Sequence, residues 1–430
     1  MPKPRRHILT IIAPGILVAA TGVGAGDLAT GAFTGAKLGV AILWVVLLGA
    51  FLKFVLTEGL ARYQLATGQT LLDGAIQHLG PVVRFIFLIY LLTWSVFVGA
   101  ALMSATGVAA HAMFPVFNGR ALGPYQDADL AKIIFGAAHS AVGVALVLLG
   151  GFKLFEKIMS VCIAVMFITV IVTAAMLTND WPAVATGLVV PRIPDLTIKS
   201  LSWTVALMGG VGGTLTVLCY GYWIREKSRT TPADLNTCRI DLAVGYVFTA
   251  LFGVAMVIIG SRVTAAGKGA NLVVDLADQL QTTSLGKTGR WVFLIGAWGA
   301  LFSSLLGVWQ SVPYVFADFI NQFRARRDPA SDAAAPVDPR NRAYRAYLFA
   351  IAIVPMIGLF ISFKDVQKYY AVFGACFMPM LAVALLLLNG RAKWIDPRYR
   401  NRPLTIAVLA LTILLFIAAV AATIQLKFLA

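Results

Sequence analysis

The sequence predicts an all-α polytopic membrane protein. Of its 430 residues, 59% are apolar and only 13% are charged, whereas an ordinary soluble domain carries about 25% charged residues. The mean hydropathy is +0.84, and apolar runs long enough to cross a bilayer recur along the whole chain. These observations exclude a disordered, collagen-like or disulfide-rich soluble protein.

Apolar runs define the expected helices, because a membrane-spanning helix needs about 20 mostly apolar residues. Two longer connections separate some of these runs: residues 262–290, which have helical spacing over 271–280, and the polar residues 322–345. The runs predict about eleven transmembrane helices, at residues 11–35, 38–61, 85–116, 133–151, 157–178, 200–224, 240–261, 291–321, 346–363, 368–389 and 404–427.

The net charge of +16 comes from basic residues that lie mostly between the apolar runs. This distribution favours a membrane orientation signal over nucleic-acid binding. Alternating sides through eleven spans places most Lys and Arg residues on the side of the N-terminus. We therefore expect a multi-pass protein of the cell inner (plasma) membrane, with its N-terminus in the cytoplasm, its C-terminus outside and the lipid bilayer as its partner.

Motifs of enzymes and cofactor sites are missing from the sequence. The four cysteines are scattered and form no CxxC pair, so neither a disulfide framework nor a structural zinc site is indicated. The sequence holds no phosphate-binding loop and no nucleophile–base arrangement. We expect no cofactor and no enzymatic activity.

Two predicted spans contain glycine clusters that interrupt them. The first span reads Thr21-Gly-Val-Gly-Ala-Gly-Asp27, and the sixth reads Met208-Gly-Gly-Val-Gly-Gly-Thr214. Each glycine inside a helix costs roughly 1 kcal/mol relative to alanine, so the clusters favour unwound turns. The alternative is that the glycines only allow close helix packing.

The clusters lie five spans apart, so the second half of the chain is inverted relative to the first. Paired broken helices at matching positions of inverted halves indicate the substrate site of a transporter. We expect a cytoplasmic stub at 1–10, a first five-helix repeat at 11–178, a second, inverted repeat at 199–390 and an additional helix at 404–428. The candidate substrate-binding residues are Gly24, Ala25, Gly26, Asp27, Gly210, Gly212, Gly213 and Thr214.

The order of several short motifs resembles the Nramp family of divalent-metal transporters. The motifs are Ala13-Pro-Gly-Ile-Leu-Val, Leu60-Ala-Arg62 with Ala66-Thr-Gly68, Arg239-Ile-Asp241, Gly296 to Gly307 with its two serines, and Phe377-Met-Pro379 with Asn389. The resemblance implies a LeuT-type inverted-repeat (5+5) fold with discontinuous helices 1 and 6. It also implies secondary transport of a divalent cation by alternating access.

The sequence departs from this family at its functional positions. Gly24-Ala-Gly-Asp27 stands where the family has Asp-Pro-Gly-Asn, and Gly213-Thr-Leu215 stands where it has Met-Pro-His. Loss of the thioether ligand predicts weak selectivity for transition metals, because soft ligands discriminate against Mg²⁺ and Ca²⁺. Loss of the His, and of acidic residues between Phe85 and Pro115, puts proton coupling in doubt.

Asp27 is the only acidic residue in either cluster. It is predicted to be the metal ligand, since ionisable residues at membrane depth are usually functional, or to cap the second half of helix 1. Two alternative functions stay open. The first is a transporter of the same fold for a small organic solute or anion, and the second is a non-transporting relative that has lost the metal site.

Overall fold

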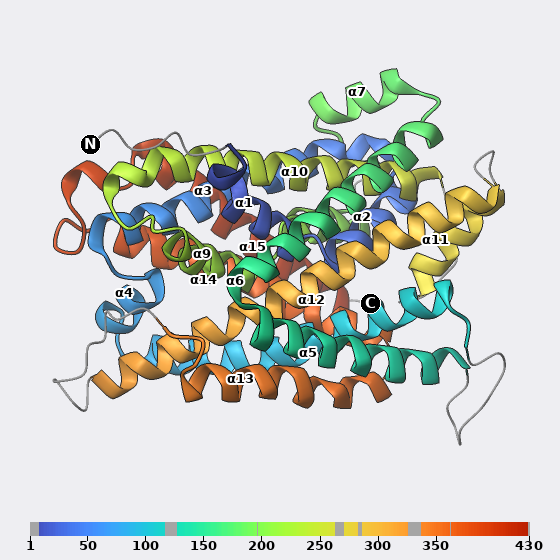
Figure 1. Cartoon of the computed structure of the whole chain (residues 1–430). Coiled ribbons are helices and arrows are strands. Elements are labelled where there is room, and N and C mark those ends of the chain that lie inside the picture. Colours follow the sequence, from blue (N-terminus) through green and yellow to red (C-terminus); the bar gives the residue numbers. More distant parts are fainter. Residues whose placement is uncertain are drawn as a thin grey trace.

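A computed structural model describes residues 8–116, 127–195, 197–262, 271–282, 286–325, 337–361 and 363–428. These residues form helices and their connections and hold no strand. The long helices run along one common direction, left to right in Figure 1. The predicted all-α membrane fold is confirmed.

The chain forms fifteen α-helices, interspersed with short 3₁₀ helices (η), over these described ranges. In chain order they are α1 (Ile8–Gly22), α2 (Ala25–Leu38), η1 (Gly39–Ile42), α3 (Leu43–Thr67), α4 (Leu71–His78), α5 (Pro81–Met113), α6 (Asp127–Leu177), α7 (Trp181–Val189), α8 (Ile198–Gly210), η2 (Leu215–Leu218), α9 (Cys219–Glu226), η3 (Pro232–Asp234), α10 (Leu235–Arg262), α11 (Asn271–Thr282), α12 (Gly286–Ala325), α13 (Arg342–Ile353), η4 (Val354–Phe360), α14 (Phe363–Leu388), η5 (Pro397–Tyr399) and α15 (Pro403–Phe428).

Each of the eleven predicted spans falls on helices of this set. By length and hydropathy alone, seven continuous segments of the described chain are long and apolar enough to cross a membrane. Gly26–Thr67 covers the second half of the first predicted span and the whole of the second, Asp129–Leu177 covers the fourth and fifth, and the stretches Cys376–Leu388 and Pro403–Ala418 are shorter apolar helices. These segments and stretches, with α1 for the first half of the first span, fall on all eleven predicted spans.

Helix α6 changes direction at Gly151, whose φ of 58° and ψ of −173° are not helical. The left-handed φ is open to glycine at little cost. The chain turns back there, so each half of α6 runs separately along the length of the protein (Figure 1). They correspond to the fourth and fifth predicted spans.

The segments that connect the long helices match the sequence predictions only in part. The helical spacing of residues 271–280 is confirmed by α11, whereas the short helices α4 and α7 were not predicted. Within the predicted polar loop 322–345, residues 326–336 lie outside the described part of the chain. Of the predicted N-terminal stub, residues 1–7 also lie outside it.

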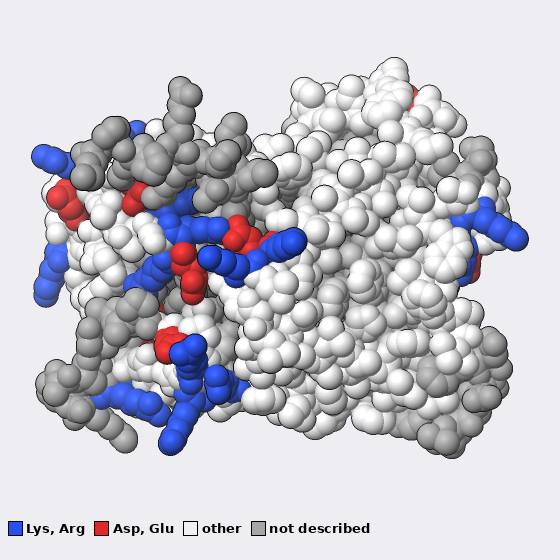
Figure 2. Space-filling model, in the orientation of Figure 1, with Lys and Arg blue, Asp and Glu red and all other residues white. Residues whose placement is uncertain are grey.

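Charged side chains are distributed unevenly over the surface. Figure 2 shows Lys and Arg gathered mainly at one end, on the left, with a broad uncharged face beside them. Large apolar side chains are exposed on several long helices, among them Phe85, Ile168 and Leu414. An exposed apolar surface of this extent fits contact with lipid chains.

The candidate substrate site between two broken helices

The first break separates α1 from α2. Helix α1 ends at Gly22, and Gly24 is extended, with φ −128° and ψ −151°, directly before α2. Gly24 is the residue that precedes the helix, and it forms no side-chain cap. The prediction that Asp27 caps this helix is therefore wrong, because Asp27 lies within its first turn. A carboxylate there is still favoured by the helix dipole.

The second break separates α8 from η2. Helix α8 ends at Gly210, and Gly212 and Gly213 have φ values of 80° and 79°. This left-handed conformation is accessible to glycine and strained for other residues. Thr214 then precedes η2 and forms no side-chain cap with it. Both glycine clusters thus unwind the chain, as predicted.

The two breaks pack against each other through their backbones. A Cβ atom built on Gly22 would lie 2.5 Å from the carbonyl carbon of Gly212, and one on Gly213 would lie 3.0 Å from Cα of Gly22. Beside the first break, a Cβ on Gly24 would overlap the hydroxyl of Ser304 on α12. The Ser304 hydroxyl donates to the Thr21 carbonyl at 2.7 Å. The glycines therefore allow two non-helical segments to meet.

This contact predicts that Gly213→Ala destabilises the protein by about 1–3 kcal/mol, through backbone strain and crowding. Gly210→Ala is the matched control, because its Cβ would meet Thr30 at an ordinary 3.7 Å and alanine favours the end of α8. Thermal unfolding of the two purified variants tests this expectation. Equal melting temperatures would contradict the packing described for Gly213.

The Asp27 carboxyl group faces the second break. Asp27 is 6% exposed, and the backbone N–H of Gly212 donates a hydrogen bond to it. Its Oδ2 atom has no hydrogen-bond partner among the described residues. A buried carboxylate oxygen with no partner is costly, so this atom marks a position where a ligand would be stabilised.

Lys53 of α3 reaches the second break from the neighbouring span. Its side chain is 1% exposed, and Nζ donates to the carbonyl of Gly209 at 2.9 Å and to that of Gly213. The ammonium also attracts the Asp27 carboxylate. Lys53 was not among the predicted site residues, although a lone lysine within the apolar run 43–56 was an available signal.

The remaining predicted residues surround this centre. The Thr214 hydroxyl accepts a hydrogen bond from Trp94 Nε1 at 3.0 Å and interacts with the Tyr370 hydroxyl. Gly26 lies against the Tyr370 ring. Ala25 is the first residue of α2, and Gly210 is the last of α8. The structure therefore brings the eight predicted positions to the two facing breaks.

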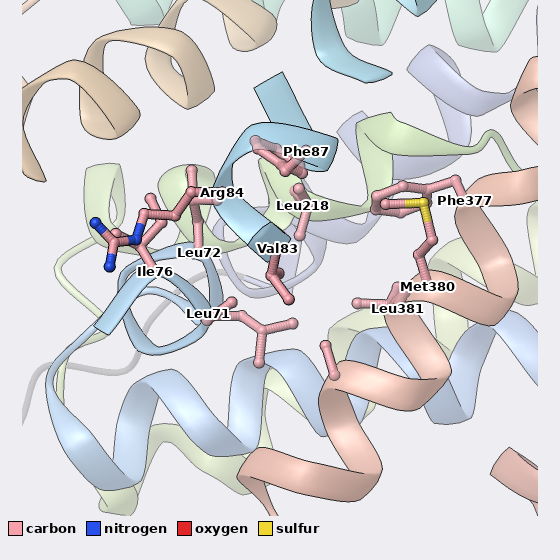
Figure 3. Close-up of a pocket in the computed structure, with 12 residues that line it drawn as sticks. Leu71, Leu72, Ile76, Val83, Arg84, Phe87, Leu218, Phe377, Met380 and Leu381 are labelled. Carbon is pink, nitrogen blue, oxygen red and sulfur yellow. The ribbon is translucent and has the colours of Figure 1, made fainter. Parts of the chain in front are cut away.

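An apolar pocket lies beside the second break, next to Leu218 of η2 (Figure 3). Apolar side chains of α4, α5, η2 and α14 line it, including Phe377 and Met380, and Arg84 is its single charged lining residue. Such a lining offers no ligand set for a cation. The polar site is at the breaks themselves.

Charged groups at the end that carries α4 form a separate cluster. Thr70 donates its backbone N–H to Asp73 at 2.9 Å and its hydroxyl to Asp318 at 3.0 Å. Burial raises the pKa of Asp73 above its ordinary value. A second group of charged side chains joins α3 to α10, where Glu58 pairs with Arg62 at 3.1 Å and with Arg239 at 2.8 Å.

Known proteins share this sequence pattern and fold. An uncharacterized protein of Pasteurella multocida is 24% identical over 308 residues, which cover 69% of this chain and 67% of that protein. A protein of Granulibacter bethesdensis named as the divalent metal cation transporter MntH is 23% identical, over 67% of this chain and 63% of its own length. The chain thus matches about two thirds of the length of these relatives.

Solved structures match over nearly the whole chain. A mutant of the Eremococcus coleocola manganese transporter has a TM-score of 0.75 at 17% identity, covering 97% of this chain and 88% of that one. MhsT in complex with L-phenylalanine has a TM-score of 0.61 at 16% identity, covering 95% and 98%. The sequence profile of the natural resistance-associated macrophage protein-like (Nramp) family matches residues 15–425. The chain therefore belongs to the Nramp family and has the fold of its transporters.

Proposed function

We propose that the protein is a secondary transporter that moves a divalent cation across the cell inner membrane by alternating access. The observation that carries this proposal is Asp27, a buried carboxylate with an unpartnered oxygen that faces the unwound backbone of the second break. A carboxylate and unwound backbone carbonyls at membrane depth form a typical cation site of broken-helix transporters. The relatives named as divalent metal cation transporters support the same class of substrate.

The proposed ligands are oxygen atoms. Asp27 supplies charge, and the carbonyls of Gly24, Gly210 and Gly213 are the backbone candidates. The Gly24 carbonyl also accepts the Leu28 N–H at 3.1 Å, which leaves a second lone pair of that oxygen for a cation. The second break, Val211 to Thr214, contains no sulfur-bearing residue. An oxygen ligand set suits hard cations, so weak selectivity for transition metals is the expected consequence.

The proposed motion relates two inverted repeats, residues 11–178 and 199–390, each of which contains one broken helix. Rocking of one bundle against the other would open the site to alternate sides of the membrane. The concentration of Lys and Arg at one end of the protein (Figure 2) supports a cytoplasmic N-terminus and an outside C-terminus.

One observation favours a second candidate, transport of a small organic solute. Lys53 and Asp27 together present both signs of charge at the breaks. A zwitterion such as an amino acid could pair its amino group with Asp27. Its carboxylate could then approach the N–H groups at the start of a half-helix.

Uptake into proteoliposomes separates these functions. We expect Mn²⁺ and Mg²⁺ to enter at rates within about tenfold of each other, because the ligands provide little discrimination. Competition by both cations for one saturable uptake process would support a shared site. Uptake of an amino acid that is insensitive to divalent cations would contradict the proposal and favour the organic solute. Absence of flux for every substrate would indicate a non-transporting relative.

A further inference from the structure

We propose that Lys53 is a specificity-determining residue whose ammonium group acts as a tethered cation in the substrate site. It occupies the Gly213 carbonyl, one of the proposed cation ligands, together with the neighbouring Gly209 carbonyl, so a bound divalent cation must displace it from Gly213. This inference rests on the proposed function and concerns the affinity of the same site.

The carbonyls that Lys53 binds are freed by the break itself. Helix α8 ends at Gly210, so the Gly209 carbonyl belongs to its last turn, where helices leave carbonyl groups without intrahelical partners. Gly213 lies within the unwound segment. Lys53 Nζ donates hydrogen bonds to both carbonyl oxygens, and its distance to the Gly209 oxygen is 2.9 Å. An ammonium group that binds carbonyl oxygens at a helix end takes the place of a metal cation there.

The Lys53 ammonium and the Asp27 carboxylate interact inside the protein and not at its surface. Lys53 is 1% exposed and Asp27 is 6% exposed, so water screens their attraction only weakly. Together the two side chains bring no net charge to the breaks when both are ionised. A divalent cation next to Asp27 would add two positive charges beside the ammonium. The ammonium therefore opposes cation binding both by repulsion and by occupying ligands.

A purely structural role makes a different prediction. If Lys53 only satisfied the two freed carbonyls, its removal would destabilise the break and would not tighten cation binding. If Lys53 is a competing cation, removal of its charge tightens binding even when stability falls. Affinity and stability must therefore be measured on the same variants.

The test is Mn²⁺ and Mg²⁺ titration calorimetry on the purified full-length protein, with melting temperatures recorded in parallel. We expect Lys53→Met to tighten binding of both ions at least about tenfold, which corresponds to 1.4 kcal/mol. Lys53→Gln, which removes the charge and keeps a donor, carries the same expectation and serves if the Met variant fails to fold. Lys53→Arg keeps the charge and should not tighten binding of either ion.

Lys132→Met is the matched control. Lys132 of α6 is also buried, at 6% exposed, and its Nζ also donates to a backbone carbonyl, that of Ile361 at 3.2 Å. Its second partner is Asp129, outside the broken helices. We expect its replacement to leave Mn²⁺ affinity unchanged.

The outcomes separate the inference from the proposed function. Wild-type binding that Lys53→Met and Lys53→Gln leave unchanged or weaken would overturn the inference and leave the transport proposal standing. Binding that appears only in those two variants would support the inference and contradict cation transport by the native protein. Absence of binding in all variants would overturn both.

Discussion

Asp27→Asn is expected to weaken divalent-cation binding and uptake at least about hundredfold. Loss of groups that merely orient metal ligands costs 10–100-fold in affinity, and Asp27 is proposed to be the one charged ligand. The replacement keeps the size of the side chain, and no helix cap is lost, because Gly24 and not Asp27 precedes α2. Calorimetric titration with Mn²⁺, followed by uptake into proteoliposomes, measures the change.

Asp278→Asn provides the control for this prediction. Asp278 is exposed on α11 and pairs with Arg290 at 2.7 Å, away from the breaks. Its replacement should leave binding and uptake unchanged. Equal affinities of the Asp27→Asn variant and the wild type would place the cation site elsewhere in the protein.

Asp241→Ala should produce the largest loss of stability, about 3–5 kcal/mol, because it leaves a buried charge without its partner. The Asp241 carboxylate accepts hydrogen bonds from the Gly15 N–H at 2.6 Å, the Tyr220 hydroxyl at 2.9 Å and Arg229 Nη1 at 2.8 Å. Asp241 is fully buried, and the Arg229 side chain is 1% exposed. These bonds tie α1 to α9 and α10, so both broken helices depend on them.

Unfolding of the purified protein in mixed detergent micelles tests this expectation. Asp278→Ala removes one member of a partly exposed ion pair and should cost at most about 1 kcal/mol. Replacing Asp241 by Asn together with Arg229 by Met should recover part of the loss, since no unpaired charge is then buried. A similar small loss in the Asp241→Ala and Asp278→Ala variants would contradict the structural role given to Asp241.

Much of the fold could be predicted because hydrophobic length determines where membrane helices form. The glycine clusters at 22–26 and 209–213 also predicted the two breaks, because glycine adopts non-helical backbone conformations more readily than any other residue type. The predicted helix cap, Asp27, was wrong by three residues, because Gly24 is the residue that precedes α2. The chain is extended at Gly24 and α2 begins at Ala25, so the helix begins earlier than the acidic residue suggested.

Lys53 shows why the rest of the site could not be predicted. Its carbonyl partners are 156 and 160 residues away in the sequence. Glu58 and Arg62, which are near it in the sequence, pair with each other, whereas the Lys53 side chain is directed to the end of α8 and the second break. A single lysine in an apolar run indicates function, whereas the identity of its partners depends on how the helices pack.

Anomalous scattering from Mn²⁺ in crystals of the full-length protein tests most directly whether Asp27 holds the transported cation. We expect one principal peak between the Asp27 carboxylate and the second break, at coordination distance from a carboxylate oxygen. In Lys53→Met crystals the same peak should reach full occupancy at a lower Mn²⁺ concentration. A principal peak elsewhere, for example at Asp73 and Asp318, with none at the breaks, would contradict the central claim that Asp27 holds the transported cation.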